Sequence, residues 1–154
     1  MKAPTLFKVN EPNVIYEIVD GETILLNLNS GYFFNLEGSG EIVWQYILET
    51  GNVKKAIQIM TSANRKIREM ISSSVTEFVA LLVNEKLLVP SDTVESSHGL
   101  QETEEKLKAS AQNFSPPKMN KYADNQNVLF FSASYFIEEK GWPESIENTG
   151  LIGV

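Results

Sequence analysis

The stretch IVDGETILLNLNSGYFFNLEGSGEIVWQYI, residues 18–47, decides the fold of this chain. Apolar and polar residues alternate over residues 14–19, 23–28 and 32–36, which is the period of half-buried strands. Asp20-Gly21 separates the first two segments and favours a tight hairpin turn, because glycine tolerates a positive φ. The pattern predicts a meander of three short antiparallel strands.

The residues after the third strand predict helices. Gly38-Ser39-Gly40 breaks the strand pattern, and Ser39 is in position to cap a helix with one apolar stripe. Gly51 is placed to end that helix, and Asn52 is placed to cap the next one. A third helix follows, with apolar residues at helical spacing over several turns. The sequence thus predicts an α+β domain over residues 1–90, in which a three-stranded antiparallel sheet is followed by three helices.

Composition and charge restrict the classes of function. The chain has 154 residues, of which 42% are hydrophobic and 21% charged, and this composition supports a packed core. The net charge of −7 argues against binding to nucleic acid or to an anionic membrane surface. The absence of cysteine excludes thiolate metal sites and thiol nucleophiles. Because no apolar run has the ~20 residues of a membrane span, and no signal peptide is visible, we expect a cytoplasmic protein.

Few residues suggest chemistry. His98 is the single histidine, and it lies in a serine-rich stretch without partners at ligand spacing. The string from Glu37 to Gly40 lacks the lysine and the spacing of a phosphate-binding loop. Glu138 and Glu139 are adjacent, and such neighbours rarely converge on one substrate, so they indicate a solvated face. We therefore expect no catalytic residue, no metal ligand and no cofactor, and we predict that the chain is not an enzyme.

The C-terminal part differs in character from the first ninety residues. Residues 91–154 carry 10 acidic and 5 basic side chains, a net charge of −5. Small and polar residues dominate 91–113, which predicts a flexible linker with a transient helix over 101–112. Pro116-Pro117 follows, and residues 114–154 form a tail with several apolar runs.

Residues 18–47, together with EKLLV at 85–89, resemble the PqqD-like family. These are the peptide-recognition domains, or RiPP recognition elements, of pathways that make ribosomally synthesised and post-translationally modified peptides. The shared order is an Asp-Gly hairpin, a Tyr-Phe strand, a Leu, a Gly, and Ile and Trp on the first helix. Here these residues are Asp20-Gly21, Tyr32-Phe33, Leu36, Gly40, Ile42 and Trp44. The family usually has adjacent Ile and Trp, so this chain departs by one residue. The resemblance covers about half of the chain and implies a small winged-helix-like fold without catalysis.

The resemblance also implies how a peptide is bound. An extended leader peptide adds to the free edge of the sheet, packs against a helix and is presented to a modifying enzyme. On this sequence the implied positions are the third strand and the third helix: Tyr32, Phe33, Phe34, Asn35, Leu36, Val75, Phe78, Val79 and Leu82. A plain core would contain the same apolar residues of the helix, and a groove and a core can share one helix.

The tail resembles the leader peptides of lasso-peptide precursors. These leaders have the pattern Tyr-x-x-Pro-x-Leu followed by a Tyr-Gly-Asp-like element. FSPPKMNKYAD, residues 114–124, matches this spacing at Phe114, Pro117, Met119, Tyr122 and Asp124. Phe for Tyr, Met for Leu and Ala for Gly are departures. The resemblance implies that one chain holds both the reader and the segment that is read, with docking either in cis or in a tail-swapped homodimer.

A fused precursor is one alternative function. Glu147 is the seventh residue counted from Gly141, which is within the ring sizes of a lasso-type linkage. Glu139 departs from the Thr that such leaders usually carry.

A winged-helix DNA-binding regulator is the other alternative. Such a protein should have a basic recognition helix. Arg65, Lys66 and Arg68 lie near the start of the third helix, but glutamates follow them and the chain is acidic overall.

Overall fold

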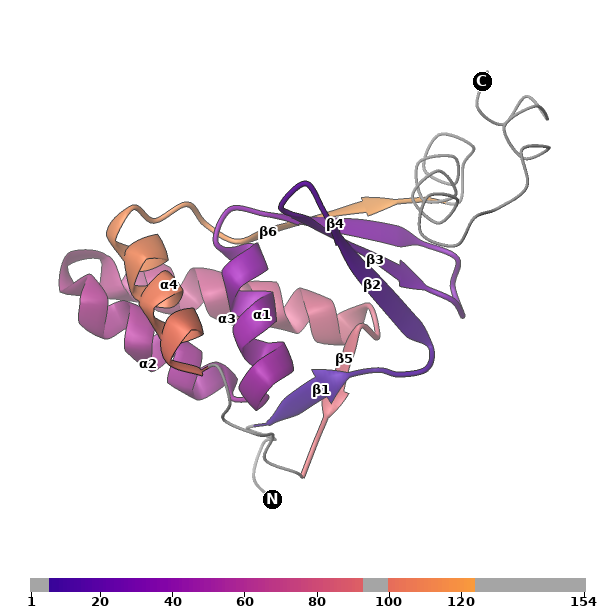
Figure 1. Cartoon of the computed structure of the whole chain (residues 1–154), viewed down its shortest axis with the longest axis horizontal. Coiled ribbons are helices and arrows are strands. Elements are labelled where there is room, and N and C mark those ends of the chain that lie inside the picture. The colour runs from indigo at the N-terminus through magenta and orange to yellow at the C-terminus, as the bar shows by residue number, and fades with distance from the viewer. Residues whose placement is uncertain (1–5, 93–99, 124–154) are drawn as a thin grey trace.

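A computed structural model describes residues 6–92 and 100–123 of the chain. It is an α+β structure, as expected, with sheet and helices arranged as Figure 1 shows. In chain order the elements are β1 (Phe7–Val9), β2 (Val14–Val19), β3 (Glu22–Asn27), β4 (Phe33–Glu37), α1 (Gly40–Thr50), α2 (Val53–Ala63), a 3-10 turn (Arg65–Ile67), α3 (Arg68–Asn84), β5 (Leu88–Pro90), α4 (Leu100–Gln112) and β6 (Lys118–Tyr122).

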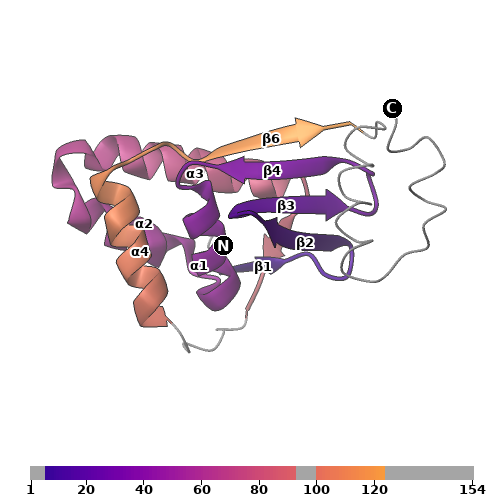
Figure 2. The ribbon, with the colours of Figure 1, turned by 45° about the horizontal axis from the view of Figure 1, so that its top comes forward.

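The larger sheet has four strands in the order β2-β3-β4-β6, and every neighbouring pair is antiparallel. Figure 2 shows these strands side by side. The meander β2-β3-β4 was predicted, but the sheet is four-stranded and not three-stranded, because the tail supplies β6. One face of the sheet is part of the core, through Val14, Leu25, Phe34 and Leu36.

A second, two-stranded sheet joins β1 to β5, with Lys8 opposite Val89. The backbone N–H of Phe7 also donates to the carbonyl of Gly51, at 2.8 Å. Neither strand was predicted, because three residues are too few to show a strand period. This small sheet ties the beginning of the described chain to the segment after α3.

The helices supply the rest of the core. The apolar stripe of α3 is buried along its length, and the largest buried side chains include Trp44 and Tyr46 of α1. Gly51 ends α1 in the left-handed conformation, with φ of 72°, and the Asn52 side chain accepts a hydrogen bond from the N–H of Lys55. Both helix ends were predicted. Ser39 stands at the N-cap position of α1, but its side chain makes no capping bond.

The helix expected over 101–112 is present as α4, but it is a packed element and not the transient helix of the flexible linker expected over 91–113. It packs against α1 and α2. Thr103, Leu107 and Ala111 are spaced four residues apart, so they lie on one face, and all three are buried. The Asn64 side chain also donates to the Ala111 carbonyl, at 2.9 Å. The sequence did not show this face, because two of its three residues are small.

Within the residues that the structure describes, no helix has both the length and the apolar composition needed to cross a membrane.

Candidate functional site

The last described strand lies along the edge of the sheet that the family resemblance implied as the receiving edge. β6 pairs with β4 antiparallel, with Met119 opposite Leu36 and Lys121 opposite Phe34. The two strands lie side by side in Figures 1 and 2. A segment of this chain thus adds to the sheet by the backbone ladder that a β-augmenting peptide would use.

The two faces of β6 have different surroundings. Met119 lies opposite Leu36, which is buried, and is itself half-buried against the core. Because side chains alternate along a strand, Lys121 shares this face, while Asn120 and Tyr122 lie on the other one. Tyr122 is opposite Phe33 and is 39% exposed. The face with Met119 is therefore the one that packs toward the core.

Two glycines lie where other parts of the chain come close to the turn into α1. Gly38 has φ of +63°, and a Cβ there would stand 2.4 Å from the carbonyl oxygen of Pro116. A Cβ on Gly40 would stand 2.9 Å from the Phe78 ring and 3.5 Å from the backbone nitrogen of Lys118. The N–H of Ser39, between them, donates to the carbonyl of residue 115, at 3.0 Å. Glycine is favoured at position 38 because the Pro116 backbone approaches so closely, and at position 40 because the Phe78 ring does.

Polar contacts fix β6 along its length. Lys121 Nζ lies 3.0 Å from Glu85 Oε2 and 4.1 Å from the centroid of the Tyr32 ring. Asn120 Nδ2 donates to Glu37 Oε2, at 2.8 Å. None of Lys121, Glu85, Asn120 and Glu37 was expected in the site from the sequence. The alternation of side chains along a strand could have indicated Lys121, because it places Lys121 on the same face as Met119.

The implied peptide-binding residues fall into two groups. Those that face the core are buried in it: Phe34, Leu36, Val75, Phe78, Val79 and Leu82. Phe33 and Asn35 belong to the other face of β4, where Asn35 donates to the carboxylate of Glu22. Tyr32 precedes β4 and packs partly buried against the core. The structure brings β6 beside β4 and into contact with α3.

The leader-like residues also differ in their surroundings. Phe114 and Met119 are half-buried against the core, and Pro117 is half-buried. Tyr122 is exposed. Asp124 lies outside the described residues, and so do His98 and the positions of the predicted ring, Gly141 and Glu147.

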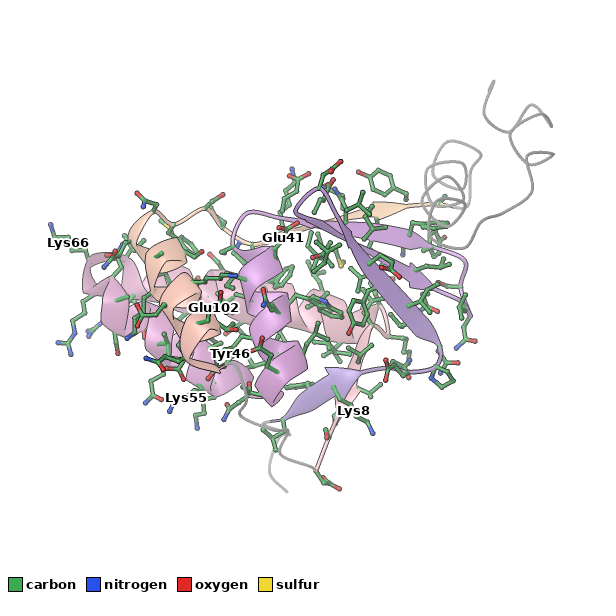
Figure 3. The ribbon with its side chains drawn as sticks, in the orientation of Figure 1. Lys8, Glu41, Tyr46, Lys55, Lys66 and Glu102 are labelled. Atoms are coloured by element: carbon green, nitrogen blue, oxygen red, sulfur yellow. The ribbon has the colours of Figure 1, made fainter. Side chains whose placement is uncertain are left out.

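One carboxyl group near the β3–α1 contact has a shifted pKa. Glu41 Oε2 accepts the backbone N–H of Thr23, at 2.8 Å, and Figure 3 shows Glu41 near the start of α1. Burial raises the pKa of Glu41, the hydrogen bond from Thr23 opposes this, and the neighbouring charge of Glu22 raises the pKa further. Among residues 6–92 and 100–123, no three His, Cys, Asp or Glu side chains are grouped to hold a metal ion.

A comparison of the chain with known protein families gives one match. Residues 22–88 match the family model described as coenzyme PQQ synthesis protein D (PqqD). No curated protein and no solved structure matches the chain. The matched range runs from β3 into β5, so it includes β4, both glycines and α3 and leaves out α4 and β6. The similarity of this chain to the PqqD family therefore covers residues 22–88.

Proposed function

We propose that this chain is a non-catalytic peptide-recognition protein of a ribosomally synthesised, post-translationally modified peptide pathway. It binds a leader segment by strand addition along β4 and presents it to a modifying enzyme. Members of the PqqD family are generally non-catalytic, peptide-binding chaperones. The observation that carries the proposal is the antiparallel pairing of β4 with β6.

The edge of β4 suits this role physically. β3 pairs with one side of β4, and the backbone groups on the other side need a partner, which an extended peptide supplies. Met119 is partly buried against the core, which supports a groove beside β4 that also takes an apolar side chain from the added strand. The backbone bonds then give affinity for any extended segment, and the side-chain contacts give selectivity.

In this chain β6 takes the position of the leader. Only residues 113–117 separate the end of α4 from β6, and five residues span at most about 18 Å when fully extended. Because α4 is anchored by buried side chains, β6 is held close to its own edge, at a high effective concentration. A leader supplied by another molecule therefore has to displace β6.

A labelled peptide tests the proposal. The probe is FSPPKMNKYA, residues 114–123, with fluorescence anisotropy as the readout. In the full chain, Met119→Asp places a carboxylate against the core and should release β6. We expect this variant to bind the probe at least about tenfold more tightly than the unmodified chain, in which β6 competes. A probe with the same Met119→Asp change is the matched control and should bind neither chain.

Two outcomes would contradict the proposal. One is that the probe fails to bind the Met119→Asp chain although its circular dichroism shows intact helices. The other is that the control probe binds as well as the original, since the groove would then play no part.

The same pairing favours a fused precursor as a second candidate function. The leader-like segment that pairs with β4 comes directly before residues 124–154 in the sequence, as a leader precedes the peptide that is modified. Co-expression with neighbouring modifying enzymes, followed by mass spectrometry, tests this candidate. A mass loss or a cleavage near Gly141 is expected, and an unchanged full-length mass would contradict it.

A further inference from the structure

Lys121 lies in a subsite built by two parts of the chain that are far apart in sequence. Its ammonium group is 3.0 Å from Glu85 Oε2, just after α3, and 4.1 Å from the ring centroid of Tyr32, just before β4. A carboxylate and an aromatic face are the two groups that attract an ammonium or guanidinium ion most strongly in proteins. The pair is therefore suited to one class of side chain.

The subsite is held by the domain and not by β6. Asn27 is only 2% exposed, and its Nδ2 donates to the backbone carbonyl of Glu85, at 3.0 Å. Its Oδ1 accepts the N–H groups of Asn29 and Ser30, at 2.9 and 3.2 Å, in the turn that leads to Tyr32. One buried side chain thus fixes both the turn before Tyr32 and the backbone of Glu85. The subsite keeps its shape when another peptide replaces β6.

We propose that Tyr32 and Glu85 form a cation-binding subsite of the groove, and that the leader bound in trans carries lysine or arginine there. This inference rests on the proposed function and adds the class of ligand. Met119 and Lys121 are two residues apart and face the same side of the strand. The groove therefore selects an extended segment with an apolar residue, any residue, and then a basic residue.

The expected selectivity is moderate. The Lys121 side chain is 40% exposed and that of Glu85 is 20% exposed, so water and salt screen the pair in part. Together, an ion pair and a cation–π contact at such a site should contribute about tenfold in affinity. A carboxylate at the same position of the peptide would instead face Glu85.

The test compares two labelled probes on one protein. They are residues 114–123 with lysine at position 121, and the same peptide with the Lys121→Glu change. Both are titrated into the full chain carrying Met119→Asp, with and without Glu85→Lys. On the chain that keeps Glu85, the lysine probe should bind about tenfold more tightly than the probe with the Lys121→Glu change. On the chain with Glu85→Lys, this preference should be reversed. Glu102→Lys makes the same charge change on α4, away from β6 (Figure 3), and should leave the preference unchanged.

The outcomes separate this inference from the proposed function. If neither probe binds, the proposed function fails. If both probes bind equally to all chains, the groove is a peptide site and the cation-binding subsite is refuted.

Hydrogen exchange in the full chain gives a readout without any added peptide. Lys121→Glu should speed the exchange of the β6 amides about tenfold, and the Lys121→Glu/Glu85→Lys double change should restore much of the protection. Exchange that is the same in all three chains would overturn the inference.

Discussion

Helix α4 and strand β6 both lie outside the range that matches the PqqD family, and they are attached to the domain in different ways. α4 inserts side chains: Leu107 and Ala111 are 0% exposed and Thr103 is 2% exposed. β6 attaches through a backbone ladder to β4, and its side chains are half-buried or exposed.

The difference follows from how each element pairs its backbone N–H and C=O groups in hydrogen bonds. A helix pairs its own N–H and C=O groups, so it can dock only by burying particular side chains. An edge strand pairs its backbone with a neighbour, so any extended segment of suitable pattern can take its place. α4 is therefore a fixed part of this molecule, whereas β6 occupies the position that another peptide would fill under the proposed function.

Matched truncations on the two elements should give the largest contrast. Leu107→Ala removes a fully buried side chain and should lower the free energy of unfolding by about 2–5 kcal/mol. Met119→Ala removes a half-buried side chain at the edge and should cost about 1 kcal/mol or less. Urea unfolding followed by circular dichroism measures both values. Equal losses would mean that β6 is as much a part of the core as α4.

A change at Gly38 should release β6 while α4 stays in place. Gly38→Ala combines a positive φ, which costs about 1–2 kcal/mol, with a Cβ 2.4 Å from the Pro116 carbonyl oxygen. Gly21→Ala is the matched control, because its φ is +79° and no atom lies within 4 Å of the added Cβ.

Hydrogen exchange separates the two glycine variants. Both should lose stability, but only Gly38→Ala should expose the β6 amides to fast exchange. If the β6 amides respond alike in the two variants, the approach of Pro116 is not what limits docking.

A polar contact should stabilise α4 alone. Thr103 Oγ1 donates to the Glu49 carboxylate, with distances of 2.7 and 2.9 Å to its two oxygens. Thr103→Val removes this donor and should cost about 1 kcal/mol in urea unfolding. The exchange of the β6 amides relative to global unfolding should not change. A selective loss of protection in β6 would show that the two elements are coupled.

The smallest effect concerns Glu41, whose carboxylate accepts the backbone N–H of Thr23 in β3. Because burial raises its pKa in the folded protein, the folded state binds this proton more tightly than the unfolded state. Its contribution to stability is therefore present below the ordinary value of 4.5 and is lost as pH rises through the raised pKa.

Glu41→Gln tests this linkage, because it keeps an oxygen acceptor for the Thr23 N–H and removes the titration. The variant should gain stability relative to the unmodified chain as pH rises above 4.5. Urea unfolding across this pH range measures the difference. A difference that does not vary with pH would contradict the assignment to Glu41.

The sequence was most informative where local signals are strong. Period-two alternation and Asp20-Gly21 predicted the meander, and Gly51 and Asn52 predicted the boundary between α1 and α2. The signals were weak for β1 and β5, each with three residues, and for α4, whose buried face includes Thr103 and Ala111. Residues of this kind can be recognised as buried only when the surface that packs against them is known.

For the candidate site, the sequence suggested which segments belong together but not how side chains meet. Met119 and its neighbours were singled out by pattern, and the structure places that segment beside β4. Lys121 and Glu85 were missed, because a contact between residues 36 positions apart depends on the register of β6 and on where α3 ends.

The sequence by itself determined the order from β2 to α3, the glycines at the turn into α1 and the apolar stripe of α3, since these depend on local backbone preference and periodicity. Only the tertiary structure decided that α4 joins the core, that the edge of β4 is filled from within the chain, and that Lys121 lies between Tyr32 and Glu85. These features depend on contacts between distant segments, and such contacts stabilise the protein only once both segments are in place.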